Sequence, residues 1–115
     1  MRVESFSFGR MTIDGKQYTS DVIVSKDGMI NSSWWRKEGH NVHPGDIGEI
    51  IDANPEIVIF GTGASGLMKV SKEVKEQLQQ KGIDVDHMLT SKAKDKFNEL
   101  VNQGKRVVLA AHLTC

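Results

Sequence analysis

Glu56-Ile57-Val58-Ile59-Phe60-Gly61-Thr62-Gly63-Ala64-Ser65-Gly66 is the segment that decides the fold, and it lies near the middle of the chain. Its four consecutive apolar residues, 57–60, predict a short strand that is buried on both faces. The glycines that follow predict a tight turn at the end of this strand. We therefore expect residues 57–60 to form the central strand of the domain.

The sequence after this segment alternates between helical and strand patterns. The expected elements are a helix at 71–80 capped by Ser71, a strand at 83–88, a helix capped by Thr90 or Ser91 and ended by Gly104, and a strand at 106–113. Single helices between short strands predict βαβ units with right-handed crossovers. We therefore expect the three strands to pair in parallel.

The sequence before the central strand predicts antiparallel ribbon. Asp14-Gly15 and Asp27-Gly28 are hairpin turn signals between β-prone runs. The expected meander has strands at 3–13, 18–25 and 29–35. Pro44 and Asp46 suit the start of a helix, expected at 46–53, that leads into the central strand.

These elements combine into a single α/β domain that spans residues 1–115. We expect three layers around a mixed central sheet, in which the N-terminal antiparallel meander extends or covers a parallel βαβαβ core. The length, with 38% hydrophobic and 26% charged residues, is that of an ordinary globular domain.

Charge and cysteine content narrow the expected partners. The 15 basic and 15 acidic residues give no net charge, which argues against nucleic acid as a partner. No apolar run approaches the length of a membrane span, and the first residues lack the apolar run of a signal peptide, so we expect no membrane partner. A lone Cys115 fits a reducing compartment, and we therefore expect a cytoplasmic protein.

The expected topology gathers polar residues at one edge of the sheet. The carboxyl ends of parallel strands share an edge, and ligands tend to bind there. The loop before the helix at 46–53 should return to the same edge. The residues expected to form this binding edge, suited to a small anion or a carboxylate, are Trp35, Arg36, His40, Gly61, Thr62, Gly63, His112 and Cys115.

Two motifs at this edge suggest specific chemistry. Gly61, Gly63 and Gly66 spell the G-x-G-x-x-G of a dinucleotide site, but the motif lies mid-chain and residues 67–70 separate it from the next helix. We interpret it as a tight turn and expect no cofactor. Cys115 with His112 offers a nucleophile and a base, although an ordinary buried thiol is the simpler interpretation. The sequence identifies no catalytic residue.

A metal site is the third possibility at this edge. His40-x-x-His43 and His112-x-x-Cys115 supply the four ligands that zinc requires. The spacing of the first pair is unusual for structural zinc, and we therefore predict no metal.

Several segments resemble the small Mth-type domain family. They are Phe8-Gly9-Arg10-Met11, Trp35-Arg36 with Gly39 and His40, the strand 57–63, the runs 82–85 and 98–104 with Arg106-Val107, and the segment 112–115. That family includes the adipogenesis-associated Mth-domain-containing protein of animals. More distantly, the chain resembles assembly factor 3 of mitochondrial complex I. The resemblance implies one Mth-type α/β domain over residues 1–115, with no established reaction and a role through protein contacts.

Two functions of different class follow. The first is a non-enzymatic protein-interaction or assembly module with a protein partner that the sequence does not identify. The alternative is a small-molecule or anion-binding protein, possibly an enzyme, with its site at the carboxyl edge of the parallel strands.

Overall fold

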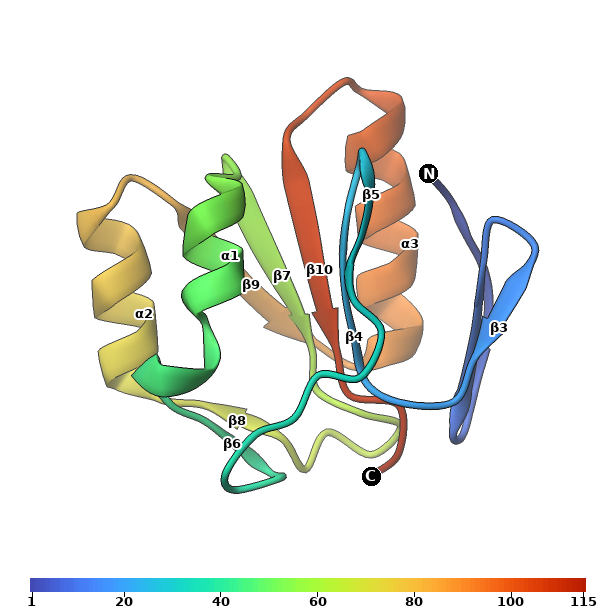
Figure 1. The fold of residues 1–115 in the computed structure, drawn as a ribbon, viewed down its shortest axis with the longest axis horizontal. Helices are drawn as coiled ribbons and strands as arrows, with labels where there is room; N and C mark the ends of the chain where they lie inside the picture. The colour runs from blue at the N-terminus through green and yellow to red at the C-terminus, as the bar shows by residue number, and fades with distance from the viewer.

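A computed structural model describes residues 1–115 and has a five-stranded mixed sheet at its centre (Figure 1). The strand order is β5-β4-β10-β7-β9. The bounds are β4 Val22–Ser25, β5 Gly28–Asn31, β7 Ile57–Gly61, β9 Asp84–Met88 and β10 Val107–Ala111. Strands β10, β7 and β9 pair in parallel, and β4 and β5 extend them antiparallel. The predicted parallel core and the mixed three-layer fold are confirmed.

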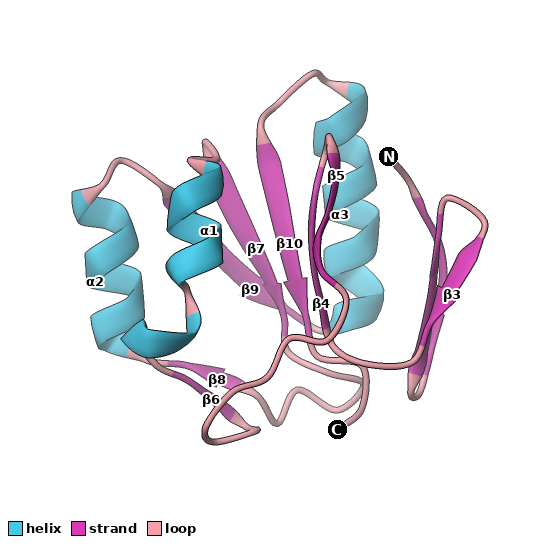
Figure 2. Ribbon diagram, viewed as in Figure 1, coloured by secondary structure: helices cyan, strands magenta, loops and turns pink.

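Helices cover both faces of this sheet, as Figure 2 shows. Helices α1 (Gly48–Ala53) and α2 (Lys72–Gln80) lie on one face, and α3 (Thr90–Asn102) lies on the other. Side chains alternate between the faces along each strand. Phe60 of β7 therefore joins a core cluster with Val74 and Leu78 of α2, whereas its neighbour Ile59 joins a second cluster with Phe97 of α3.

The first residues form a separate three-stranded sheet. Its strands are β1 (Val3–Ser7), β2 (Arg10–Ile13) and β3 (Lys16–Tyr18). The prediction of one strand over 3–13 is wrong, because the chain reverses at Phe8-Gly9 and Ser7 pairs with Arg10. The side chain of Asn98 in α3 ties this sheet to the core, since its amide accepts from Val3 N–H and donates to Val3 C=O at 2.8 Å each.

The hairpin signals locate two of the turns. Asp14-Gly15 joins β2 to β3 as predicted. The second turn consists of Lys26-Asp27, one residue earlier than predicted, with Gly28 already paired in β5. The expected third strand, 29–35, ends instead at Asn31, and the rest of that run is loop.

The helix predictions are close to the structure. The expected helix 46–53 consists of a 3₁₀ turn, η1 (Pro44–Asp46), followed by α1. The Ser71 hydroxyl accepts the Val74 N–H and caps α2 as predicted. The cap prediction for α3 is wrong, because Leu89 holds the N-cap position and Thr90 begins the helix. No helix is both long and apolar enough to cross a membrane.

One pairing is unexpected. Two-residue strands β6 (Asn41–Val42) and β8 (Lys69–Val70) pair in parallel beside the carboxyl ends of β7 and β10 (Figure 1). They join the loop that carries Trp35 and Arg36 to the chain that follows the glycine turn. Segments distant in sequence therefore meet at this edge.

Candidate functional site at the carboxyl edge

A buried ion pair lies at the carboxyl edge of the parallel strands. Asp21 precedes β4, and it lies at this edge because β4 runs antiparallel to β10. Its Oδ2 is 2.6 Å from Nη2 of Arg36, and the two side chains are 16% and 3% exposed. Nε and Nη2 of Arg36 also donate to the carbonyl oxygen of Gly39, at 3.1 and 2.8 Å. The guanidinium thus bridges residues 36 and 39 of the loop and, through Asp21, anchors that loop to the sheet.

His112 completes the network. Its Nδ1 is 2.8 Å from Oδ2 of Asp21, and because a carboxylate only accepts, Nδ1 carries the hydrogen. The other ring nitrogen, Nε2, lies 3.3 Å from the hydroxyl oxygen of Thr114. The backbone N–H of Leu113 donates to the other carboxylate oxygen, Oδ1, at 2.8 Å. Asp21 therefore connects the end of β10 with the loop of Arg36.

The ionisation of Asp21 reflects two opposed effects. Burial by itself raises the pKa of a carboxyl group. The hydrogen bonds from His112, Arg36 and the Leu113 N–H act in the opposite direction, and together they lower the pKa of Asp21 below its usual 3.8. Asp21 is therefore a carboxylate at neutral pH and a counterion for Arg36.

Trp34 packs against the same guanidinium. The Cζ atom of Arg36 lies 4.4 Å from the centre of the Trp34 ring, a cation–π contact. The indole N–H donates to the Asp46 carbonyl at 3.1 Å, and the ring lies 6.4 Å from that of Phe60. Nη1 of Arg36 is buried without a hydrogen-bond partner. The loop is thus fixed from inside by both Trp34 and Arg36.

Trp35 projects the opposite way from its two buried neighbours. It is 76% exposed and borders an open cleft of about 470 Å³. The cleft is lined by Trp35, Lys37, Glu38, His43, Gly45 and Asp46. Nε2 of His43 lies 3.0 Å from Oε2 of Glu38 at the surface. This hydrogen bond raises the pKa of His43 above 6.5 and lowers the pKa of Glu38 below 4.5.

The glycine turn is occupied by the chain itself. Gly63 N–H donates to Oγ1 of Thr90 at 2.9 Å, and that hydroxyl donates to the carbonyl of His112 at 2.7 Å. The N–H groups of residues 64, 65 and 67 donate to the carbonyls of Thr114 and Cys115. Gly66 is followed by β8 rather than by a helix. The N–H groups that would hold a phosphate in a dinucleotide site are therefore already bonded, in agreement with the tight-turn interpretation.

The predicted site residues divide into two groups. Arg36, His40, Gly61 and Gly63 converge on the segment His112–Cys115: the rings of His40 and His112 are 5.5 Å apart, and His112 N–H donates to the Gly61 carbonyl at 2.9 Å. Thr62 bonds to the Met88 carbonyl, and Trp35 faces outward. A binding role for these residues stays a prediction.

The proposed zinc ligands are not assembled. His40 packs on His112, whereas His43 bonds to Glu38. The structure contains no group of three or more His, Cys, Asp or Glu side chains that could hold a metal ion.

Four large hydrophobic side chains are exposed on segments that lie at this edge. The large hydrophobic side chains that are exposed are Phe8 at 62%, Trp35 at 76%, Leu67 at 48% and Leu89 at 40%. The turn of Phe8 is tied to β10 by the Gly9 N–H, which donates to the Leu113 carbonyl at 2.7 Å. Leu67 N–H donates to the Cys115 carbonyl at 3.0 Å, and the Leu89 side chain packs over Gly66. We call these four side chains the apolar face.

Sequence reasoning missed several of these residues. Asp21 stands alone between two strands, and its partners are far away in the chain, so no local pattern marked it. In the sequence, nothing distinguishes the exposed Phe8 and Leu89 from apolar residues of the core. The one available signal for Asp21 was its position as a charged residue directly before the buried run Val22–Val24.

Comparisons with known proteins agree with this fold. A curated relative from Francisella tularensis subsp. holarctica (strain LVS), named 13 kDa major membrane protein, is 26% identical over 99 residues, which is 86% of this chain and 80% of that protein. A conserved hypothetical protein from Pyrococcus horikoshii OT3 has a TM-score of 0.85 at 24% identity, with 100% of both chains covered. MT938 has a TM-score of 0.82 at 26% identity, covering 99% of this chain and 98% of its own.

A Bordetella pertussis protein described as a Mth938-like domain superposes with a TM-score of 0.62 at 17% identity, covering 97% of this chain and 85% of its own. A family model described as a protein of unknown function (DUF498/DUF598) matches residues 3–112. The Mth-type resemblance is thereby confirmed, and the chain belongs to the DUF498/DUF598 family.

Proposed function

We propose that this chain is a non-enzymatic protein-interaction module whose contact surface is the apolar face at the carboxyl edge of the sheet. The observation that carries the proposal is the position of Trp35. It is strongly exposed, yet Trp34 and Arg36 on either side of it are buried and bonded. An exposed aromatic held by a fixed backbone loses little entropy on binding, which is the property of an interface hot spot.

Cations lie near the apolar side chains in the sequence, and they favour a partner whose contact surface is surrounded by acidic residues. Each of the four apolar side chains is followed, two or three residues later, by an exposed cation without an ion pair within 4.0 Å: Arg10, Lys37, Lys69 and Lys92. Among nearby acids, Asp21, Glu38 and Asp46 are bonded within the chain, and Glu73 is not. A partner that presents an apolar patch ringed by carboxylates would be complementary.

The test is affinity capture with the tagged protein from cells that carry it. Wild type, Trp35→Ala and a control, Lys81→Ala, are compared by quantitative mass spectrometry. Truncation of a hot-spot aromatic costs about 2 kcal/mol or more. We therefore expect proteins retained by wild type and by Lys81→Ala to be lost from Trp35→Ala, and retention to fall as salt concentration rises. Equal retention by all three variants would contradict the proposal.

The proposal includes a cytoplasmic location. The single cysteine supports it, because a reducing compartment requires no disulfide. The name of the Francisella relative, a major membrane protein, supports the opposite location for that protein. Cell fractionation decides between them: we expect the chain in the soluble fraction, and recovery in the membrane pellet that resists a salt wash would contradict this.

A second candidate is a small-anion site at the same edge. It is favoured by Nη1 of Arg36, which is buried without a partner. The measurement is an NMR titration with inorganic phosphate, which should shift the ring signals of His112 in a saturable way if an anion reaches the guanidinium. Unchanged His112 signals would exclude this candidate and leave the interaction module untouched.

A further inference from the structure

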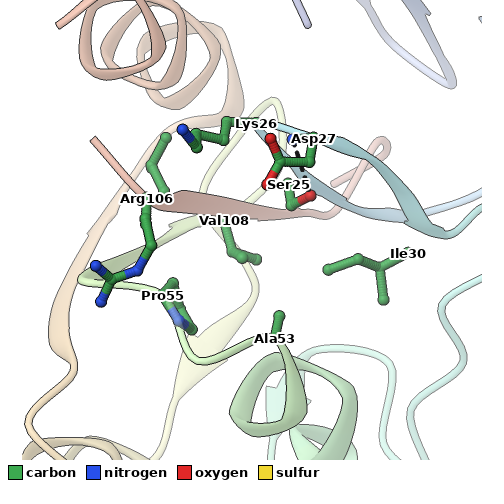
Figure 3. A pocket seen from close by; sticks show the side chains of 9 residues that line it. Ser25, Lys26, Asp27, Ile30, Ala53, Pro55, Arg106 and Val108 are labelled. Carbon is green, nitrogen blue, oxygen red and sulfur yellow. Dashed lines mark hydrogen bonds between the residues drawn. The ribbon is translucent and has the colours of Figure 1, made fainter. Parts of the chain in front are cut away.

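A cavity of about 220 Å³ lies at the opposite, amino edge of the parallel strands (Figure 3). It is bounded by the turn between β4 and β5, by the end of α1 and by the start of β10. The residues that line it are Ser25, Lys26, Asp27, Ile30, Ala53, Pro55, Arg106, Val107 and Val108. None of these residues belongs to the apolar face or to the buried network of Asp21.

The floor of the cavity is apolar and rigid. Figure 3 shows the side chains of Ile30, Ala53, Pro55 and Val108 around the hollow; they come from β5, from α1, from the loop that follows α1 and from β10. Val108 is fully paired in the sheet, opposite Ser25 of β4. The N–H of Lys26 donates to the Val107 carbonyl at 3.2 Å and fixes the turn above the hollow. The cavity is therefore preformed rather than opened by a ligand.

The rim of the cavity carries two cations. Neither Lys26 nor Arg106 has an acid within ion-pair distance, and the one acid that lines the cavity is Asp27. Glu56 stands nearby, but its Oε2 accepts the backbone N–H of Arg106 at 2.8 Å, which is the main reason that its pKa is lowered. The Arg106 guanidinium has no carboxylate within 4.0 Å, and the charge of Glu56 interacts with it and with Lys26 at longer range.

We propose that this cavity binds a small aliphatic carboxylate, with its chain on the apolar floor and its carboxylate toward Lys26 and Arg106. At about 220 Å³ the hollow is small, so it suits a short aliphatic chain of about five or six carbons. Pockets for drug-sized ligands start at about 300 Å³. The inference concerns a different edge of the sheet and does not depend on the proposed interaction surface.

The test is an NMR titration of the full chain with hexanoate. Ligands of this size reach dissociation constants on the order of 1 mM. We expect saturable shifts centred on Ile30, Ala53 and Val108. Hexanamide, which lacks the charge, and acetate, which lacks the chain, should each bind at least about fivefold more weakly. Equal binding of hexanamide, or shifts centred on Trp35, would overturn the proposal.

Variants of the lining residues provide an independent readout. Ala53 is exposed at the end of α1, so Ala53→Leu should fill the hollow without disturbing the core and should abolish hexanoate binding. Arg106→Gln should weaken binding roughly two- to fivefold. Lys81→Gln removes a cation that does not line the cavity and should bind as wild type does. If Ala53→Leu and Arg106→Gln both bind hexanoate with the wild-type affinity, the site is not this cavity.

Discussion

The two edges of the parallel sheet use their side chains in opposite ways. At the carboxyl edge, the polar groups are bonded to one another: Asp21, Arg36 and His112 form a buried network, and the glycine turn bonds to residues 114–115. Apolar side chains such as Trp35 point outward there. At the amino edge, apolar side chains line a hollow, and the cations of Lys26 and Arg106 have no acidic partner.

This difference qualifies a general expectation about α/β proteins. The carboxyl ends of parallel strands are where ligands tend to bind, because loops and helix N-termini converge there. In this chain polar groups do converge there, but apart from Nη1 of Arg36 they bond to one another and leave a fixed outer surface. The open space lies outside this network: neither the cleft of about 470 Å³ beside Trp35 nor the hollow of about 220 Å³ at the amino edge is lined by Asp21, Arg36 or His112. Convergence of polar residues and availability of a cavity are therefore separate properties.

The largest expected effect is a difference in stability between alanine variants of the two adjacent tryptophans. Trp34 is buried against Arg36 and Phe60, so Trp34→Ala should lower the free energy of unfolding by about 3–5 kcal/mol. Trp35 is exposed, so Trp35→Ala should change it by less than about 0.5 kcal/mol. Chemical denaturation at neutral pH measures both. A similar loss in the two variants would show that the outer surface is not free for a partner.

The next effect concerns the buried ion pair. Asp21→Ala leaves the buried Arg36 without its counterion and should cost about 3–5 kcal/mol of unfolding free energy. Glu56→Ala, at the amino edge, removes an exposed acid and should cost clearly less. Equal losses of unfolding free energy in the two variants would mean that the Asp21 network stabilises the fold no more than the exposed Glu56 does.

The fall of the unfolding free energy at low pH tests the same ion pair. A carboxyl group whose pKa is lowered by folding contributes stability that is complete above its unfolded pKa and is lost as the pH falls through the folded value. For Asp21 that loss lies below pH 3.8. In Asp21→Asn, the unfolding free energy should therefore fall less steeply below pH 3.8 than in wild type. An equally steep fall in both proteins would contradict a lowered pKa for Asp21.

A smaller effect is expected from the glycine turn. Gly63 has φ +108°, and a Cβ there would lie 2.4 Å from the carbonyl carbon of Cys115. Gly104 also has positive φ, at +77°, but a Cβ there would meet no atom within 4 Å. Both alanine variants carry backbone strain of about 1–3 kcal/mol. Gly63→Ala should be the less stable of the two in thermal unfolding, because it also displaces residues 114–115; equal melting temperatures would contradict that packing.

The smallest effect is in the titration of His43 beside Trp35. Its pKa is raised above 6.5 by the hydrogen bond to Glu38, so the contribution of this bond is complete below pH 6.5 and is lost as the pH rises through the folded value. NMR titration of the imidazole should give a midpoint above 6.5 in wild type and a lower one in Glu38→Gln. A midpoint that does not move would show that the two side chains are not paired in solution.

Much of the fold was predictable because its signals are local. The runs of apolar residues located β7 and β10, and the Asp-Gly pairs located two turns, since the turn chemistry belongs to adjacent residues. The turn at Phe8-Gly9 was missed because a lone glycine after phenylalanine is a weak signal. Strands β6 and β8 were missed because two residues are too few to show a period.

The candidate site was predictable only in outline. The topology placed Arg36, His40 and His112 at the same edge, because that follows from strand order alone. Asp21 was missed, since it pairs with residues 15 and 91 positions away in the chain. Thr90 or Ser91 was expected to cap α3, but the Thr90 hydroxyl links Gly63 to His112 instead. The amino-edge cavity arises from packing between α1, β4 and β10, and no sequence pattern encodes an empty space.

The most direct test of the account asks which edge a partner covers. Hydroxyl-radical footprinting compares the free protein with the complex recovered by affinity capture and reads the oxidation of exposed side chains. We expect protection of Phe8, Trp35, Leu67 and Leu89 in the complex, with Ile30 at the amino edge unchanged. Protection centred on Ile30, with Trp35 oxidised as in the free protein, would contradict it.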